Sequence, residues 1–488
     1  MVHQARSAQR AWAGQTIAER LRIISKFRGL LPGKADEWCR VAREELGKEE
    51  QITLSGDILP LAEACRFLVK RSVSILSIRK VKLSDTPWMF FGSRTWVERH
   101  PRGVVGVIGT WNYPYCLSGV QILQALVAGN VVLFKPSEVA PRCSALLASL
   151  VLETGLPSGI FQVLPHQREF GSALVAGGID HVVFTGSSSV GRMVAGATAE
   201  RLVSSTLELS GCDPLLALAD ADPALVAKSA WFGALVNHGQ TCVATRRILA
   251  SYPVLEKVEA HLLPMVRGVS PFRLVRPPEG QKAIALAREA VSQGARWVGG
   301  EPDWMQAADA CPPLVLGDVR PEMRIAREAL FAPVLCLMGA PSDDHLVALE
   351  ENCPYSLGSS VFGGKKDNAR RVASQLRSPN ISINEVVIAL GHPSTPIVAR
   401  GESGWGCTQG AEGLLEMTVP RVFFQAASGW WGFRPHLGLV AQGGNVANDM
   451  NELLKAMLVS GHDASWTHRI LAGLSMPRKA WKWWKGSD

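Results

Sequence analysis

The chain has 488 residues, of which 47% are apolar and 19% are charged, and this composition excludes a largely disordered protein. By the usual sizes of domains, a chain of this length divides into about two to four of them. The net charge of +8 is small for the length, and basic clusters are sparse outside the C-terminal tail, so nothing supports nucleic-acid binding.

The cysteines and the N-terminus indicate where the protein works. The ten cysteines contain no C-x-x-C pair, so we expect no disulfide framework and no metal site, and a reducing compartment is implied. The first residues, MVHQARSAQRAWAG, lack the apolar core of a secretion signal, and no window reaches about 18 uninterrupted apolar residues. We therefore expect a soluble, cytoplasmic protein.

The N-terminal third changes character near residue 104. Apolar positions at helical spacing predict two or three surface helices within residues 1–80, and RTWVERHP (94–101) predicts a half-exposed strand of a projecting hairpin. From Val104 onward, apolar runs of strand length alternate with helical segments. Such continuous apolar strands, joined through helices, predict a doubly wound parallel α/β domain. The predicted strands are 104–109, 131–135, 161–164 and 181–185, and the predicted helices follow Pro114 and cover 141–154 and 168–176.

A second α/β region begins near Thr206. Asp222 and Pro223 form an N-cap and a first-turn proline, and the helix that they open is expected to run to about Val236. A further helix is predicted at 281–293, and strands are predicted at 214–219, 246–250, 335–339, 359–363 and 381–384. Residues 427–488 hold six of the fifteen tryptophans and form an extension of separate character.

One cysteine lies in a polar break between two apolar runs. Cys242, in LVNHGQTCVATRR, follows a Gly-Gln turn where a side chain can face a cleft, and a thiolate there adds readily to carbonyl carbons. His238, one turn earlier, is a candidate base, although a catalytic base is normally distant in sequence. A lone cysteine is more often structural.

Other candidates stand at the ends of predicted strands. Asn112, in GTWNYP, offers an amide to a developing oxyanion, or forms a turn before Pro114. Lys135 and Glu138, in FKPSE, lie where open α/β sheets bind ligands. Gly186 opens GSSSVG, whose amides suit a pyrophosphate or make a plain strand-to-helix turn.

Together these motifs resemble one family. GTWNYP, FKPSE, FTGS, LELSG and GQTC occur in the order and spacing of the aldehyde dehydrogenase superfamily, from about Gln9 to Phe424. The spacing from Glu208 to Cys242 (242 − 208 = 34) matches that family, as does the spacing from Asn112 to Lys135 (135 − 112 = 23). The motifs look most like the branch that acts on fatty and aromatic aldehydes.

The resemblance implies the chemistry. Cys242 would attack an aldehyde, Asn112 and the Cys242 amide would hold the oxyanion, hydride would pass to the nicotinamide, and Glu208 would activate the water that hydrolyses the thioester. The implied cofactor is NAD, because an acidic side chain suits a free 2′-hydroxyl, with NADP as the alternative. The residues implied to bind it are Trp111, Lys135, Ser137, Glu138, Gly186, Ser187 and Phe331.

The sequence also departs from the family. The family usually has two acids before its F-G-P motif, whereas REALFAP here places Ala329 where the second acid grips the nicotinamide ribose, with Glu328 one position early. Either Glu328 reaches the ribose through a local shift, or the ribose is held less firmly.

The family architecture predicts the domains: two doubly wound α/β domains and a small β arm for oligomerisation, which implies a homodimer. The cofactor domain comprises 1–84 and 101–206, the arm 85–100 and 416–426, the catalytic domain 207–391, the return segment 392–415 and the extension 427–488.

Three alternatives stay open. A CoA-acylating relative would release the thioester to a thiol and would not need Glu208, and a non-catalytic scaffold would be compatible with Ala329. The third concerns the tail PRKAWKWWKGSD, whose tryptophans and lysines suit an anionic membrane surface, or whose tryptophans pack on the protein.

Overall fold

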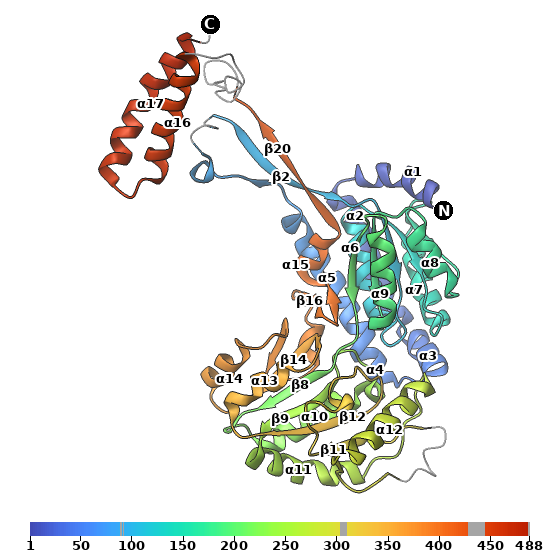
Figure 1. Cartoon of the computed structure of the whole chain (residues 1–488). Coiled ribbons are helices and arrows are strands. Elements are labelled where there is room, and N and C mark those ends of the chain that lie inside the picture. Colours follow the sequence, from blue (N-terminus) through green and yellow to red (C-terminus); the bar gives the residue numbers. More distant parts are fainter. Residues whose placement is uncertain (88–89, 91, 303–309, 428–444, 487–488) are drawn as a thin grey trace. The chain divides into compact units, whose positions relative to one another are not determined.

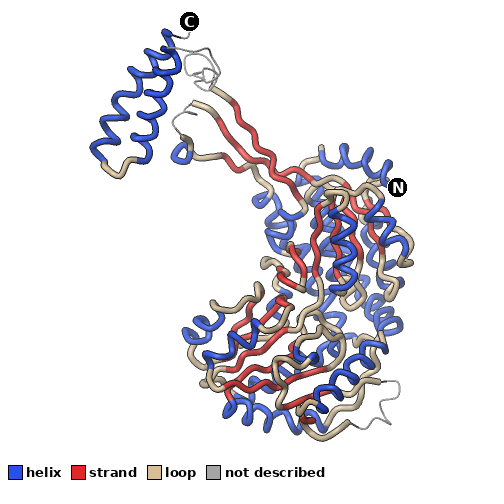
Figure 2. Tube along the Cα trace, viewed as in Figure 1, coloured by secondary structure: helices blue, strands red, loops and turns tan. Residues whose placement is uncertain are grey.

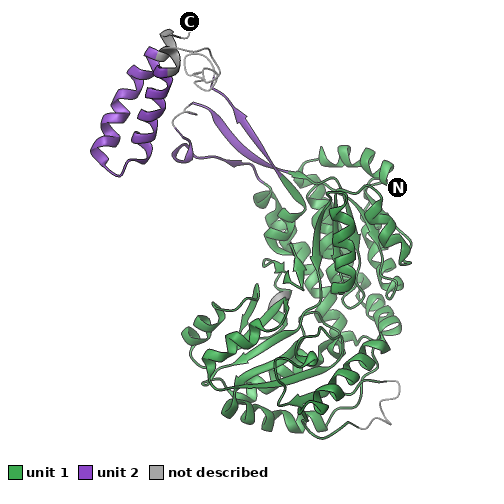
Figure 3. Cartoon of the chain, viewed as in Figure 1, with its two compact units in different colours: residues 1–76, 100–419 green, residues 77–99, 420–488 purple. Residues whose placement is uncertain are grey.

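The structure is a computed structural model that describes residues 1–87, 90, 92–302, 310–427 and 445–486. The chain forms two compact units: unit 1 contains residues 1–76 and 100–419, and unit 2 contains residues 77–99 and 420–488 (Figure 3). Unit 1 holds two large sheets with their helices (Figure 2).

Helices fill the N-terminal part of unit 1. The prediction of two or three helices was too low, because short polar breaks divide this segment further. Thr16 and Glu19 form a reciprocal capping box at the start of α2, and Gly47, in the left-handed conformation, ends α3. The α-helices are α1 (Val2–Ala13), α2 (Ile17–Leu30), α3 (Ala35–Leu46), α4 (Glu50–Thr53) and α5 (Leu59–Ile75).

The first large sheet has six strands in the order β18-β7-β6-β3-β4-β5, all parallel except β18. Figure 1 labels the helices α6 to α9 that accompany this sheet. Every residue of β3, β4 and β6 is buried, as helices on both faces of a parallel sheet require. The strands are β3 (Val104–Ile108), β4 (Val131–Lys135), β5 (Phe161–Val163), β6 (His181–Thr185), β7 (Ser204–Glu208) and β18 (Gly404–Trp405), and the helices are α6 (Cys116–Val127), α7 (Pro141–Glu153), α8 (Glu169–Ala176) and α9 (Ser188–Ala199).

The strand order reverses at β3. β4 and β5 continue to one side of β3, whereas β6 and β7 lie on its other side. Open α/β sheets bind ligands at the carboxyl ends of the two strands where such a reversal occurs. This point, between β3 and β6, is therefore the expected place for a cofactor.

The second large sheet has seven strands in the order β10-β11-β12-β9-β8-β14-β15, with only β10 antiparallel to its neighbour. The predicted strands at 214–219, 246–250, 335–339, 359–363 and 381–384 are present, and β10 and β11 are added. The strands are β8 (Asp213–Ala217), β9 (Thr245–Ser251), β10 (Arg296–Trp297), β11 (Leu314–Gly317), β12 (Val334–Ala340), β14 (Gly358–Phe362) and β15 (Asn380–Ile383). The helices are α10 (Pro223–Leu235), α11 (Tyr252–Arg267), α12 (Pro277–Ser292), α13 (Leu346–Glu351) and α14 (Lys366–Ala373). The doubly wound α/β fold class is confirmed.

The connection between the sheets is short. β7 ends at Glu208 and β8 begins at Asp213, so the boundary expected after residue 206 falls inside β7. After β15 the chain returns to the first sheet through β18, and α15 (Gly410–Glu416) packs against α5 and α6. Two further antiparallel pairs of short strands are present. β13 (Tyr355–Ser356) pairs with β17 (Arg400–Gly401), and β16 (Ile397–Val398) pairs with β19 (Cys407–Thr408).

A three-stranded sheet lies mainly in unit 2. Its order is β1 (Arg79–Lys80), β2 (Arg94–Pro101) and β20 (Thr418–Gln425), so β20 is an edge strand among the residues that the structure describes. Trp96 and Phe423 stack across β2 and β20 with ring centroids 5.1 Å apart. Cross-strand aromatic pairs of this kind fix the register of a sheet.

The extension contains two long helices, α16 (Asn445–His462) and α17 (Trp466–Gly486), which pack against each other. Met450, Leu453, Ala456 and Met476 form their buried contact. Trp481 is exposed, whereas the side chains of Trp483 and Trp484 lie outside the described residues. Within the described ranges, no helix combines the length and apolarity that crossing a membrane demands.

Candidate active site

Cys242 lies at the end of a tight loop. The short helix η5 (Val236–Gly239) precedes it, and Asn237 and His238 hold left-handed φ angles of 52° and 57°. At Gly239 a Cβ atom would lie 2.5 Å from the carbonyl oxygen of Ala332, so a side chain would not fit. The Cys242 side chain is half-buried, and burial together with the nearby Glu208 carboxylate raises the pKa of the thiol to about 12. The thiol is therefore protonated at neutral pH and must lose its proton to react.

Glu208 is the last residue of β7 and is almost fully buried. The hydroxyl of Thr408 donates to Oε1, and Thr185 Oγ1 and Gln121 Nε2 each lie 3.5 Å from Oε2. Burial raises the pKa of Glu208 to about 7, although these three hydrogen bonds oppose the shift. At neutral pH about half of the Glu208 side chains are thus able to accept a proton.

Gly211 lies in the loop that brings the Glu208 carboxylate near Cys242. A Cβ atom at Gly211 would lie 2.6 Å from the carbonyl oxygen of Cys242, so the loop after β7 touches the cysteine backbone. The Glu208 carboxylate also lies close enough to Cys242 for its charge to raise the pKa of the thiol. The structure thus brings together a thiol and a carboxylate that are 34 (242 − 208) positions apart in the sequence.

Asn112 completes the group from the end of β3. Its side chain is buried, and Oδ1 accepts a hydrogen bond of 2.9 Å from Thr110 Oγ1. Nδ2 donates to the carbonyl oxygen of Gln240, two residues before Cys242, at 3.2 Å. An amide nitrogen carries two hydrogens, so Nδ2 keeps a second donor for another acceptor.

His238 belongs to a different environment. Its ring stacks on Phe272 with centroids 4.7 Å apart, and burial lowers its pKa. No hydrogen bond joins His238 to Cys242 among the described residues. The structure therefore gives no support to a Cys-His pair.

The residues expected to hold the adenosine ribose follow β4. Lys135 is buried, and its Nζ lies 2.8 Å from Oε2 of Glu138, whose side chain is exposed. Ser137 Oγ accepts a hydrogen bond of 3.2 Å from Val139 N. A fixed ammonium and an exposed carboxylate offer a donor and an acceptor to sugar hydroxyls.

Gly186 and Ser187 lie at the end of β6, where the strand order reverses. Gly186 N donates to the carbonyl oxygen of Glu208 at 3.0 Å. Ser187 is the exposed N-cap of the twelve-residue α9. The first-turn amides of α9 carry partial positive charge, so the chemistry of this donor set fits a pyrophosphate.

Trp111 and Phe331 meet between the two large sheets. Their ring centroids lie 5.9 Å apart at 55°. Close by in sequence, Ala329 supplies no acid, and Glu328 Oε2 is bound to Lys282 Nζ at 2.8 Å. The carboxylate of Glu328 is thus already held by a lysine of α12, and the expected second acid is missing.

Sequence reasoning missed the partners of Glu208. Thr408, Thr185 and Gln121 come from β19, β6 and α6, and their contacts depend on how those elements pack. Their residue types are common on buried strands and helices, so no local signal distinguishes them. Only the three-dimensional arrangement shows their role.

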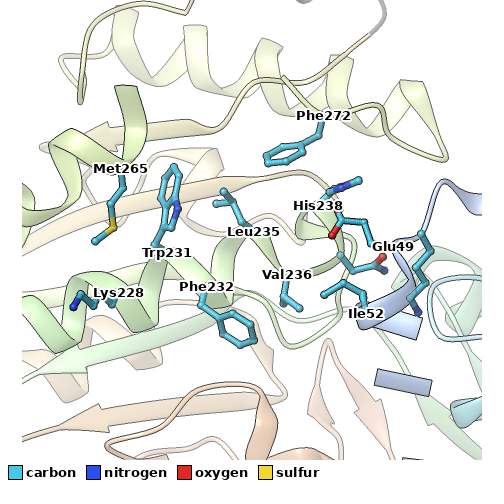
Figure 4. Close-up of a pocket in the computed structure, with 12 residues that line it drawn as sticks. Glu49, Ile52, Lys228, Trp231, Phe232, Leu235, Val236, His238, Met265 and Phe272 are labelled. Atoms are coloured by element: carbon cyan, nitrogen blue, oxygen red, sulfur yellow. The ribbon is translucent and has the colours of Figure 1, made fainter. Parts of the chain in front are cut away.

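A pocket of about 430 Å³ lies beside the loop that leads to Cys242 (Figure 4). Its walls are mainly apolar and come from α10, η5, α11 and the segment near α4. Asn237 connects the pocket to the site, because its Nδ2 donates to the carbonyl oxygen of Asn112 at 3.3 Å. The lining residues are Lys48, Glu49, Ile52, Lys228, Trp231, Phe232, Leu235, Val236, Asn237, His238, Met265 and Phe272.

Comparison with known proteins identifies the family. The aldehyde dehydrogenase family model matches residues 1–423. The chain belongs to the aldehyde dehydrogenase family. It is 32% identical over 428 residues to 4,4'-diapolycopene aldehyde oxidase of a Methylomonas species, covering 86% of this chain and 79% of that relative. It is 30% identical over 429 residues to a putative NADP-dependent succinate-semialdehyde dehydrogenase of Mycolicibacterium smegmatis, covering 85% of this chain and 82% of that relative.

Solved structures of aldehyde dehydrogenases match most of the chain in fold, and they include complexes with NADP and with NAD+. NADP-dependent glyceraldehyde-3-phosphate dehydrogenase of Bacillus halodurans, complexed with NADP, matches with a TM-score of 0.81 and 26% identity, over 88% of this chain and 90% of that chain. An aldehyde dehydrogenase of Mycobacterium tuberculosis, complexed with NAD+, matches with a TM-score of 0.80 and 27% identity, over 88% and 90%. This aldehyde dehydrogenase therefore catalyses the NAD(P)-dependent oxidation of an aldehyde to a carboxylic acid. Neither the CoA-acylating nor the scaffold alternative is favoured.

Proposed function

We propose that Cys242 is the nucleophile, Glu208 the general base and Asn112 the oxyanion donor of the oxidation. The observation that carries this assignment is that the Cys242 loop lies beside the other two residues: Gln240 O accepts from Asn112 Nδ2, and the Glu208 carboxylate lies close enough to raise the pKa of the Cys242 thiol. Glu208 supplies a carboxylate whose pKa, about 7, suits proton transfer at neutral pH.

These groups account for each proton of the reaction. Glu208 takes the proton of the Cys242 thiol, and the sulfur forms a bond to the aldehyde carbon while Asn112 Nδ2 and the Cys242 amide stabilise the oxyanion. Bound NAD(P) supplies the acceptor for the hydride. Glu208 then releases the first proton to solvent. Water attacks the Cys242 thioester that remains, and Glu208 accepts a proton from that water. The carbon–sulfur bond breaks, the carboxylic acid leaves, and Glu208 returns the proton to the sulfur of Cys242.

We assign the six-stranded sheet to cofactor binding and the seven-stranded sheet to catalysis. Lys135, Ser137 and Glu138 would bind the adenosine ribose, and Gly186 and Ser187 would approach the phosphates. Trp111 and Phe331, which meet between the sheets, would flank the nicotinamide end. The carboxylate of Glu138 favours NAD, because it would repel a 2′-phosphate.

We propose an apolar aldehyde as the substrate. The mainly apolar pocket beside the Cys242 loop supports this choice, and one relative is named 4,4'-diapolycopene aldehyde oxidase. The test is a panel of aliphatic and aromatic aldehydes with NAD and with NADP, read as formation of the reduced cofactor. Failure to turn over any of them would overturn the assignment, and acyl-CoA formation on addition of CoA would favour the acylating alternative.

The nucleophile has its own test. Replacing Cys242 by Ser should abolish oxidation, because a hydroxyl is a far weaker nucleophile than a thiolate. Replacing Cys407, the other half-buried cysteine, by Ser gives a matched control that should stay active. Unchanged activity of Cys242→Ser would remove the thiol from the mechanism.

We infer a homodimer from the edge strand β20. Val419, Val422 and Phe424 expose large apolar side chains on it, and an unpaired edge readily adds a strand from a second copy. Binding of the Trp-rich and Lys-rich tail to an anionic membrane stays a prediction. Co-sedimentation with vesicles that contain phosphatidylserine, with and without residues 477–488, tests it.

A further inference from the structure

A fully buried ion pair lies beneath the segment that carries Asn112. Lys48 follows α3, and Asp57 belongs to the π-helical turn η2 (Leu54–Ile58) that precedes α5. Lys48 Nζ lies 2.5 Å from Asp57 Oδ2, and the two side chains are 1% and 0% exposed. Neither charge reaches solvent, so both depend on protein partners.

Both charged side chains form hydrogen bonds with backbone groups of the segment between β3 and α6. Lys48 Nζ donates to the carbonyl oxygen of Asn112 at 2.9 Å. Asp57 Oδ1 accepts from the backbone amides of Tyr115 and Cys116 at 3.1 and 2.9 Å, at the N-terminus of the twelve-residue α6. A carboxylate is favourable there because it meets the positive end of the helix dipole. The ion pair thus holds the segment from Asn112 to Cys116 at both ends.

The Tyr113 ring packs closely against the ion pair. Lys48 Nζ lies 3.9 Å from the centroid of the Tyr113 ring. A Cβ atom at Gly56 would lie 2.7 Å from Tyr113 Cε1, so only glycine admits the ring at this distance. The Asn112 carbonyl also accepts from Asn237 Nδ2 at 3.3 Å, and Asn237 stands five residues before Cys242. This carbonyl therefore ties the N-terminal helices to the loop of the cysteine.

Stability alone does not account for a buried pair. Moving two charges from water into a protein interior is costly, and apolar side chains of similar volume often stabilise a fold as well or better. What apolar side chains would not provide is directed hydrogen bonds to the Asn112 carbonyl and to the amides of α6. We propose that Lys48 and Asp57 are positioning residues that fix the oxyanion donor Asn112 against Cys242. This inference rests on the proposed role of Asn112.

The test compares Lys48→Met, Lys48→Arg and the apolar double variant Lys48→Met/Asp57→Leu. Displacement of a catalytic group by about 1 Å reduces turnover by about 100-fold, so Lys48→Met and the double variant should lose kcat by roughly that factor. The activity is read at saturating aldehyde, because Lys48 also lines the proposed substrate pocket. Lys48→Arg keeps the charge and should restore part of kcat. The double variant leaves no unpaired charge, so it covers the case in which Lys48→Met fails to fold.

Arg20→Met is the matched control. Arg20 is also buried, and it donates to the carbonyl oxygens of Val127 at 2.8 Å and Gln15 at 2.7 Å, near the other end of α6. The Arg20→Met variant should have a lower thermal midpoint of unfolding and an unchanged kcat. If the Lys48 variants also have a lower thermal midpoint and an unchanged kcat, the ion pair has only a structural role and the inference is wrong.

A double-mutant cycle separates this inference from the role of Asn112. If Asn112 is the oxyanion donor, Asn112→Ala alone loses kcat, and adding Lys48→Met to it should cause little further loss. Full activity of Asn112→Ala would overturn the proposed function of Asn112. Loss in Asn112→Ala with independent, multiplicative loss from Lys48→Met would overturn only the positioning role.

Discussion

The carboxylate of Glu208 accepts a hydrogen bond from the hydroxyl of Thr408, a residue 200 positions further along the chain. This contact links the end of β7 to β19 and stabilises the charged form of a buried acid. Because burial raises the pKa of Glu208 and the hydrogen bonds lower it, the value of about 7 reflects a balance between them.

The first prediction concerns the pH dependence of turnover. Glu208 acts as a base when deprotonated, so kcat should rise with pH through a midpoint near 7, the pKa of this group. Thr408→Val removes a hydrogen bond that lowers this pKa, and the midpoint should therefore move to higher pH, by about half a unit to one unit. The measurement is a pH profile of kcat.

Thr198→Val provides the control for this profile, because Thr198 is buried and its hydroxyl donates within α9 to Ala195 O. Its midpoint should match that of the unmodified enzyme. A midpoint that stays in place in Thr408→Val would show that Glu208 does not set the profile.

The second prediction concerns stability. The folded-state pKa of Glu208 is raised from 4.5 to about 7, so folding favours the protonated form and the protein loses stability as pH rises between these values. Above pH 7 the loss for this group is roughly 3 kcal/mol. The glutamine side chain in Glu208→Gln is neutral at every pH, so this variant should not lose that stability. The difference in thermal midpoint between Glu208→Gln and the unmodified protein should be larger at pH 8 than at pH 5, and equal differences would contradict the buried charge.

The third prediction concerns the choice between NAD and NADP. Glu138→Gln removes the negative charge beside Lys135 Nζ and leaves that ammonium free to meet a 2′-phosphate. The ratio of kcat/KM for NADP to that for NAD should rise by about tenfold or more, since like charges at close range disfavour binding. Glu153→Gln, which affects only a surface pair with Lys34, is the control and should leave the ratio unchanged. A constant ratio in Glu138→Gln would place the 2′-position elsewhere.

Most of the two large sheets could be predicted from the sequence because their strands are continuous apolar runs. The runs at Val131–Lys135 and His181–Thr185 became β4 and β6 without change. The sequence did not lead to β11 (Leu314–Gly317), and the N-terminal helices were undercounted because caps such as Gly47 divide them.

The site was less visible in the sequence than the fold. The three candidate catalytic residues lie in sequence motifs whose order and spacing single them out: Cys242, Glu208 and Asn112. Lys48 and Asp57 belong to no such motif, and their contacts with the backbone of Asn112 and Cys116 form only when the N-terminal helices pack beneath α6. Local pattern carries no information on such packing.

The last prediction concerns the oligomer. Val422, 66% exposed on the edge strand β20, would be covered if a second copy added a strand there. Val422→Asp places a charge in that contact and should shift the mass in solution from dimer to monomer, as measured by light scattering across a protein concentration series. Val163→Asp is the matched control, because Val163 is an exposed valine on β5, one of the two edge strands of the six-stranded sheet. A dimer lost in Val163→Asp and kept in Val422→Asp would place the interface on the other sheet.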